Sequence, residues 1–207
     1  MLRDELSFTN KVAYISTKEY IDGYRDIKRF LSYCKKCRSY EKTWACPPFC
    51  FDVDNYVSRF QHTFIIGTKI DFSEDIRRLS NSVEMRDELS SDAMHVAVDC
   101  LRTLHDRLLQ LFPNTISFLV GPCRLCKQEP CARLQGLPCR HPSEVRHSIE
   151  SVGFDVGKTT SDLLGIELKW STDHNLPEYI TIVTALFTSD DSEQFLSKLI
   201  SMLGNLY

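Results

Sequence analysis

The stretch "VAYISTKEYIDGYRDIKRFLSYCKKC" (residues 12–37) joins regular structure to chemistry within one short segment. Its first residues are apolar and β-branched, which predicts a short strand. A stripe of apolar residues at helical spacing then predicts one helix, made by Tyr20, Ile21, Tyr24, Ile27 and Leu31. Ser16 or Thr17 could cap its start. Since this helix runs directly into Cys34 and Cys37, we expect the end of the helix to position this cysteine pair.

The remaining segments alternate in the same way between strands and helices. Expected strands lie at 64–66, 115–121, 165–170 and 178–188. Expected helices cover roughly 92–112, 143–153, 155–165 and 190–204. Asp92 could cap the first of these helices and Pro113 would end it. Ser143 could cap the second helix and Gly153 would end it. Residues 72–91 are either the start of the long helix or a mobile surface segment.

This order predicts one α+β domain over residues 1–207. We expect a two-layer sandwich, with a mixed or antiparallel sheet and helices on one face. Two Cys-rich segments interrupt the regular elements. We call residues 33–51 the first cysteine loop and residues 121–142 the second cysteine loop, and we expect both to bind metal.

Composition narrows the class of protein. The chain has 207 residues, 43% of them hydrophobic, with a net charge of −3 and a sequence pI of about 6.1. This balance is typical of a globular protein and does not favour binding of nucleic acid. The first ten residues lack an apolar signal region, and no apolar run is long enough to span a membrane. We therefore expect a cytoplasmic protein.

Eight of the nine cysteines fall in the two loops. Disulfides are not expected in a reducing compartment, whereas a C-x-x-C pair lets two thiolates hold one metal from a tight turn. The spacings are C-x2-C-x8-C-x3-C and C-x2-C-x4-C-x7-C. The predicted ligands are Cys34, Cys37, Cys46, Cys50, Cys123, Cys126, Cys131 and Cys139. They form one or two sites, and the loops could contribute ligands to shared metals.

The spacing favours an iron–sulfur cluster over zinc. Structural zinc sites use two short knuckles, whereas seven residues separate Cys131 from Cys139. Iron–sulfur clusters accept irregular loops and prolines beside their ligands, as at Pro47. Zinc and redox-active thiols remain open alternatives. Basic residues among the thiols fit any thiolate–metal site, and they are Lys35, Lys36, Arg38, Arg124, Lys127, Arg133 and Arg140.

Other residues near the cysteines have weaker signals. Trp44 and Arg140 are predicted to lie beside the metal centre, Trp44 as a shield or as ordinary packing. His141 could ligate a metal in place of a cysteine, but a loop histidine or a donor to a thiolate is the preferred interpretation. Cys100 is expected to be a core residue. "GFDVGKTT" (153–160) has three residues between its glycines where a phosphate loop has four, so it indicates a helix end and a new helix start.

The segments "SYCKKCRSYEKTWACPP" and "GPCRLCKQEPCARLQGLPCRHPSEVRHSIESVGFDVGKT" resemble two signatures of a known family. Its members are predicted metal-binding proteins of unknown function, common in anaerobic bacteria and archaea. The resemblance implies that the ligands are Cys34, Cys37, Cys46, Cys123, Cys126, Cys131 and Cys139. Cys50 lies outside the family pattern, and Gln128, Glu129 and Pro130 widen the gap before Cys131. No activity follows from the resemblance.

The function indicated is a [4Fe–4S] protein, with one or two clusters, in electron transfer or an accessory redox role. A redox partner protein or a small-molecule substrate would then be its partner, with no role for nucleic acid or membrane. The alternative is a zinc-binding structural or adaptor module without enzymatic activity. The sequence has no recognisable catalytic triad, carboxylate pair or dinucleotide fingerprint, so it does not indicate an enzyme class.

Overall fold

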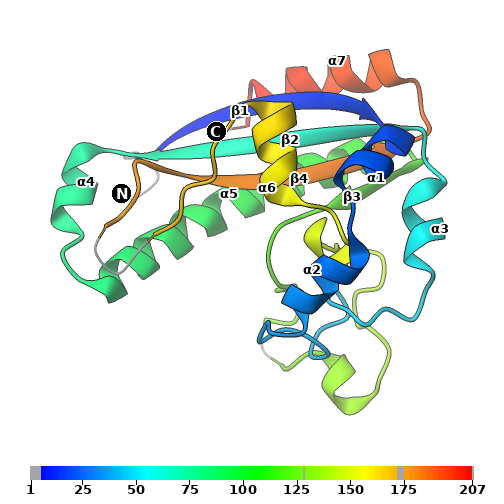
Figure 1. Ribbon diagram of the computed structural model, residues 1–207, viewed down its shortest axis with the longest axis horizontal. Coiled ribbons are helices and arrows are strands. Elements are labelled where there is room, and N and C mark those ends of the chain that lie inside the picture. Colours follow the sequence, from blue (N-terminus) through cyan, green and yellow to red (C-terminus); the bar gives the residue numbers. More distant parts are fainter. Residues whose placement is uncertain (1–5, 128, 172–174, 207) are drawn as a thin grey trace.

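The computed structural model describes residues 6–127, 129–171 and 175–206 (Figure 1). Its strands are β1 (Leu6–Ser16), β2 (His62–Phe72), β3 (Thr115–Phe118) and β4 (Tyr179–Thr188). Its α-helices are α1 (Thr17–Tyr24), α2 (Ile27–Cys34), α3 (Val53–Ser58), α4 (Glu74–Leu79), α5 (Val83–Leu111), α6 (Val156–Leu164) and α7 (Ser192–Leu203). Two 3-10 turns are η2 (Ala132–Gln135) and η3 (Glu150–Val152).

The four strands form one antiparallel sheet in the order β1-β2-β4-β3. The central strands β2 and β4 are buried along most of their length, because both of their faces are covered. The prediction of an α+β fold with an antiparallel or mixed sheet is confirmed. Within the described residues, none of the helices combines the length and the apolar character needed to cross a membrane.

The core lies on both faces of the sheet. On one face, α5 and α7 form a helical layer, with Leu101, Leu104 and Phe195 packed on β2 and β4. On the other face, the shorter α1 and α6 contribute Tyr20 and Leu164 to a second cluster. Figure 1 shows α5 and α6 on opposite sides of the strands. The sequence analysis expected helices on one face only, but the helices cover both faces of the sheet. The sheet with α5 and α7 forms the predicted two layers.

The helix expected over residues 17–31 is two helices, because the chain is extended at Arg25. Arg25 has φ −119° and ψ 128° and forms an antiparallel bridge with Phe154. The amide of Asp26 donates to the Gly153 carbonyl at 2.8 Å, and the amide of Asp155 donates to the Tyr24 carbonyl at 2.8 Å. Asp26 then caps α2 by accepting from the Arg29 amide. Ser16 caps α1, as predicted.

The long helix begins earlier than expected. Ser82, and not Asp92, accepts from the Met85 amide at the start of α5. Residues 72–91 therefore hold α4 and the first turns of α5, so the helical alternative for this segment is correct. The helix ends at Leu111, just before Pro113, as predicted.

Two further expectations are wrong. Residues 143–149 are not helical, because the His147 backbone forms a parallel bridge with Phe118 and accepts from the Leu119 amide at 2.9 Å. Residues 165–170 form no strand. Gly165, with φ +59°, ends α6 in a left-handed conformation, and the Ile166 amide returns to the Thr160 carbonyl. The expected strand at 178–188 and the last two helices are confirmed as β4, α6 and α7.

Candidate metal centre

The two cysteine loops lie against each other below the sheet, where α2 ends (Figure 1). Arg133 of the second loop donates to three carbonyls of the first loop, those of Thr43 at 2.7 Å, Cys46 at 2.5 Å and Pro48 at 2.7 Å. The indole nitrogen of Trp44 donates in return to the Leu137 carbonyl at 3.0 Å. These contacts confirm that the fold brings the two loops together.

The first loop is shaped by its own backbone and by one distant side chain. Cys34 is the last residue of α2, and the Cys37 amide donates to its carbonyl at 2.9 Å, which closes the C-x-x-C turn. Glu41 has a left-handed φ of +61°, and its amide donates to the Pro47 carbonyl at 3.0 Å. The ring of His147 lies 3.0 Å, Nδ1 to oxygen, from the Ala45 carbonyl. The segment from Glu41 to Cys46 is therefore held by the contact of Glu41 with Pro47 and by the contact of Ala45 with His147.

The second loop has a short turn between its cysteines. Cys131 directly precedes η2, which Gly136 ends with a φ of +68°. Arg140 donates to the Pro130 carbonyl at 2.9 Å, pairs with Glu129 at 2.9 Å, and places Nη1 3.8 Å from the Cys126 sulfur. The loop thus folds back on itself, and Arg140 lies beside the Cys126 thiol.

None of the nine cysteines forms a disulfide. Seven are half-buried: Cys34, Cys46, Cys100, Cys123, Cys126, Cys131 and Cys139. Cys37 and Cys50 are exposed. Cys100 lies on α5, outside both loops. The loops therefore present six half-buried thiols and two exposed ones.

The thiols lie close enough to influence one another electrostatically. Burial raises the pKa of Cys34, and the neighbouring Cys46 and Cys37 raise it further. Burial likewise raises the pKa of Cys46, which Cys37 and Cys131 also raise. The pKa of Cys123 is raised by burial and then by Cys139 and Cys131. Cys131 thus interacts with thiols of both loops. Thiolates that repel one another in a partly buried site are stabilised by a cation.

A pocket of about 380 Å³ opens where the loops meet. The first loop contributes Arg38, Ser39, Lys42 and Thr43 to its walls. The second loop contributes Cys123, Cys126, Cys131 and Leu134. Three of the predicted ligands thus face one cavity, whose opposite wall carries two basic residues.

Within the described residues, no three Cys, His, Asp or Glu side chains already surround a single point as metal ligands. The donor chemistry nevertheless fits a thiophilic metal, because eight thiols stand on two joined loops and none is oxidised to a disulfide. The role of each cysteine, and those of Trp44 and Arg140, remain predictions. Trp44 packs under the Arg133 guanidinium, 5.1 Å from the ring centroid, so it serves at least the contact between the loops.

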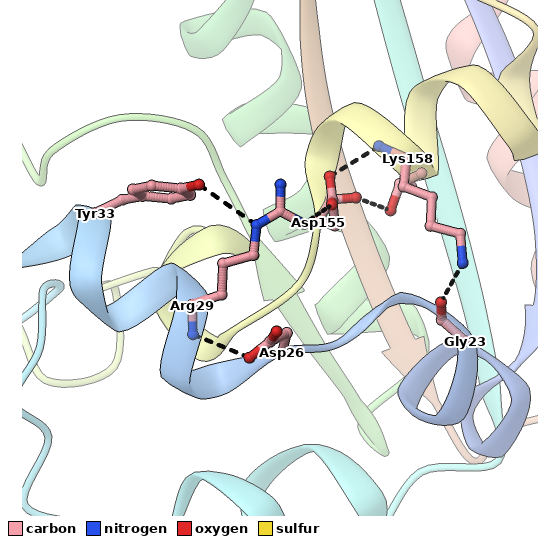
Figure 2. A network of polar contacts seen from close by, with 7 residues as sticks. Gly23, Asp26, Arg29, Tyr33, Asp155 and Lys158 are labelled. Atoms are coloured by element: carbon pink, nitrogen blue, oxygen red, sulfur yellow. Dashed lines mark hydrogen bonds and ion pairs between the residues drawn. The ribbon is translucent and has the colours of Figure 1, made fainter.

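The helix that carries Cys34 is held from the side by polar contacts to the start of α6 (Figure 2). Arg29 of α2 pairs with Asp155 at 3.1 Å. Asp155 also accepts from the Lys158 amide, and the Lys158 ammonium donates to the Gly23 carbonyl at 2.7 Å. The segment that resembled a phosphate loop thus caps a helix and fixes α2, which confirms the helix-start interpretation.

Sequence reasoning missed two residues that build the site. Arg133 was one cation among several near the thiols, and only the fold shows that it joins the loops. His147 had no motif, yet it reaches Ala45 beside Cys46. A basic residue two positions after a predicted ligand was the only available signal for Arg133. Gln128, which widens the C-x4-C gap, lies outside the described residues.

Comparison with known proteins identifies a family. The family model described as "Predicted metal-binding protein (DUF2284)" covers residues 23–187, a span that includes both cysteine loops. No curated protein and no solved structure matches the chain.

Proposed function

We propose that this chain, which belongs to the DUF2284 family of predicted metal-binding proteins, holds an iron–sulfur cluster where its two cysteine loops meet. The observation that carries the proposal is the joining of the loops through Arg133 and Trp44, with half-buried thiols on both sides. Eight thiols on two joined loops supply the donor type that such clusters require.

The electrostatic contacts favour ligands drawn from both loops. Cys34, Cys37 and Cys46 lie together, and Cys131 of the second loop is the thiol that also interacts with Cys46. We propose that Cys131 completes the first-loop set. Cys50, which is exposed at the end of that loop, is the competing fourth ligand.

Cys123, Cys126 and Cys139 would then form a second thiol set. The Cys139 sulfur accepts from the His141 amide at 3.4 Å, and Arg140 stands beside Cys126. Hydrogen bonds and positive charge near cluster sulfurs stabilise the reduced, more negative state. With three thiols, this set would leave one metal position for another ligand.

A bound cluster would supply one-electron transfer. The protein's part is to hold the thiols, to neutralise their charge with Arg133 and Arg140, and to limit access of water through Trp44. A redox partner protein or a small-molecule substrate in the cytoplasm would be the other participant. This proposal includes no contact with nucleic acid or membrane.

Anaerobic purification followed by a visible spectrum and analysis of iron, sulfide and zinc tests the proposal. We expect a coloured protein with iron and sulfide in similar amounts. A colourless protein with stoichiometric zinc and no iron would instead establish the zinc module. Protein free of both metals after anaerobic purification would contradict metal binding altogether.

Four cysteine variants, one of them a control, test the ligand assignment. Cys131→Ser is expected to lose as much iron as Cys46→Ser does, because both belong to one set. Cys100→Ser is the matched control, since Cys100 lies on α5 outside the loops, and it should retain the wild-type iron content. Loss of iron in Cys50→Ser, with Cys131→Ser unaffected, would contradict the assignment and make Cys50 the ligand.

A further inference from the structure

We infer that the pocket between the loops binds a small molecule through a carboxylate or phosphate group. The inference deepens the proposed function and rests on it, because it places an anionic substrate beside the proposed metal centre. The pocket has a volume of about 380 Å³, within the range of small-molecule sites.

The two walls of the pocket differ in chemistry. The wall from the first loop carries Arg38 and Lys42, with hydroxyl groups on Ser39 and Thr43. A guanidinium and an ammonium with hydroxyl donors are the groups that bind oxyanions. The opposite wall carries thiols of the second loop, so an anionic ligand would be oriented with its charged end away from them.

The two cations of the pocket are available for a ligand. In the part of the chain that the structure describes, neither Arg38 nor Lys42 forms an ion pair with a carboxylate, and both residues are exposed. Two other cations near the thiols are already engaged, because Arg133 binds three carbonyls and Arg140 pairs with Glu129. None of the described residues that line the pocket is acidic.

Leu134 adds an apolar contact at the rim of the pocket, where 57% of the residue is exposed. A ligand that joins an oxyanion to a short carbon skeleton would use both the cations and this leucine. The group of the ligand opposite the oxyanion would then face Cys123, Cys126 and Cys131. The ligand class is therefore a small organic acid or a phosphorylated metabolite.

Calorimetric titration of the metal-loaded protein with succinate, and separately with inorganic phosphate, tests the inference. We expect at least one probe to bind at micromolar to millimolar concentration, and the stronger one identifies the class. Arg38→Gln/Lys42→Gln should weaken its affinity by tenfold or more, because two charge-assisted contacts are lost. The matched control is Lys35→Gln/Lys36→Gln, which removes the same charge from exposed residues of the same loop that do not line the pocket.

The control should change affinity by no more than about twofold, the size expected of screened surface charge. Equal losses in the two double variants would overturn the inference, because a general basic field would then explain the binding. Failure of both probes to bind the wild type would overturn it as well. Metal analysis of the same samples separates the two proposals, since metal-free protein that still binds a probe contradicts only the proposed function.

Discussion

Substitution of Arg133 is the most direct test of how the two cysteine loops are held together. The guanidinium donates to the carbonyls of Thr43, Cys46 and Pro48, and it stacks on Trp44. Arg133→Ala removes all four contacts and leaves the cysteines unchanged. Arg133→Lys keeps the charge, but one ammonium cannot match the planar fork that reaches three carbonyls.

The expected cost follows from these contacts. A hydrogen bond from a charged donor contributes about 1.5 kcal/mol at the low end, so three would give about 4.5 kcal/mol. The side chain is half-buried, and water can replace part of this at the exposed Pro48 carbonyl. Stacking on Trp44 adds about 0.5 kcal/mol. We expect a net loss of about 3 kcal/mol in loop docking, or roughly 100-fold in the opening equilibrium.

Hydrogen–deuterium exchange of the amides in residues 41–48 measures this opening. The Glu41 amide, bonded to the Pro47 carbonyl, and the Cys46 amide, bonded to the Thr43 carbonyl, should exchange roughly 100-fold faster in Arg133→Ala. Amides of β2 should be unchanged, because the sheet does not depend on this contact. The rate of metal loss to a chelator should rise in the same variant.

Arg124→Ala is the matched control, since Arg124 is an exposed cation of the same loop. It should exchange like the wild type. Wild-type exchange at residues 41–48 in Arg133→Ala would refute the argument, because the loops would then be held by other contacts. Equal acceleration in Arg124→Ala would also refute it, since net charge rather than geometry would be responsible.

Two further predictions concern stability. Gly153→Ala should destabilise the fold by about 3 kcal/mol in denaturant titration, because Gly153 has φ +99° and a Cβ would lie 2.9 Å from Ile27 Cγ1. The control Gly136→Ala has open space around the added Cβ and should cost about 1 kcal/mol. Equal losses of stability in the two variants would contradict the steric argument. Burial lowers the pKa of His105 to about 3, so the folded protein keeps this imidazole neutral at a pH where the unfolded chain binds a proton. The free energy of unfolding should therefore be unaffected by His105 above about pH 6.5 and should fall by up to about 1.4 kcal/mol per pH unit below that. His105→Gln should flatten the stability difference between pH 6.5 and 5, and an unchanged slope would contradict a neutral buried imidazole.

Elements with a complete local pattern could be predicted from sequence. The strand β4 and the helices α6 and α7 follow from apolar periodicity and capping residues, and the structure confirms them. The helix expected at 143–153 had equally good capping signals. It fails because the backbone of His147 is used in a bridge to Phe118, and no local pattern reports such a partner.

Sequence likewise predicts one part of the candidate site and not the other. Cysteine spacing identifies the donor type, since thiol chemistry depends on the residues themselves. The residues that bring the loops together could not be predicted, because the acceptors of Arg133 are backbone carbonyls 85 to 90 positions away. Carbonyls carry no residue identity, so no sequence pattern marks them.

The placement of Cys34 shows why both halves of the chain are needed for the site. The break between α1 and α2 arises because Arg25 and Asp26 bond to residues 152–154, just beyond the second cysteine loop. Arg29 then pairs with Asp155 and fixes the direction of α2, whose last residue is Cys34. The second half of the chain therefore holds the first loop near Cys46, through Arg133 and His147, and also holds α2, through residues 152–155. A centre that takes ligands from both loops would meet thiols that the fold has already brought together, which lowers the entropic cost of gathering them.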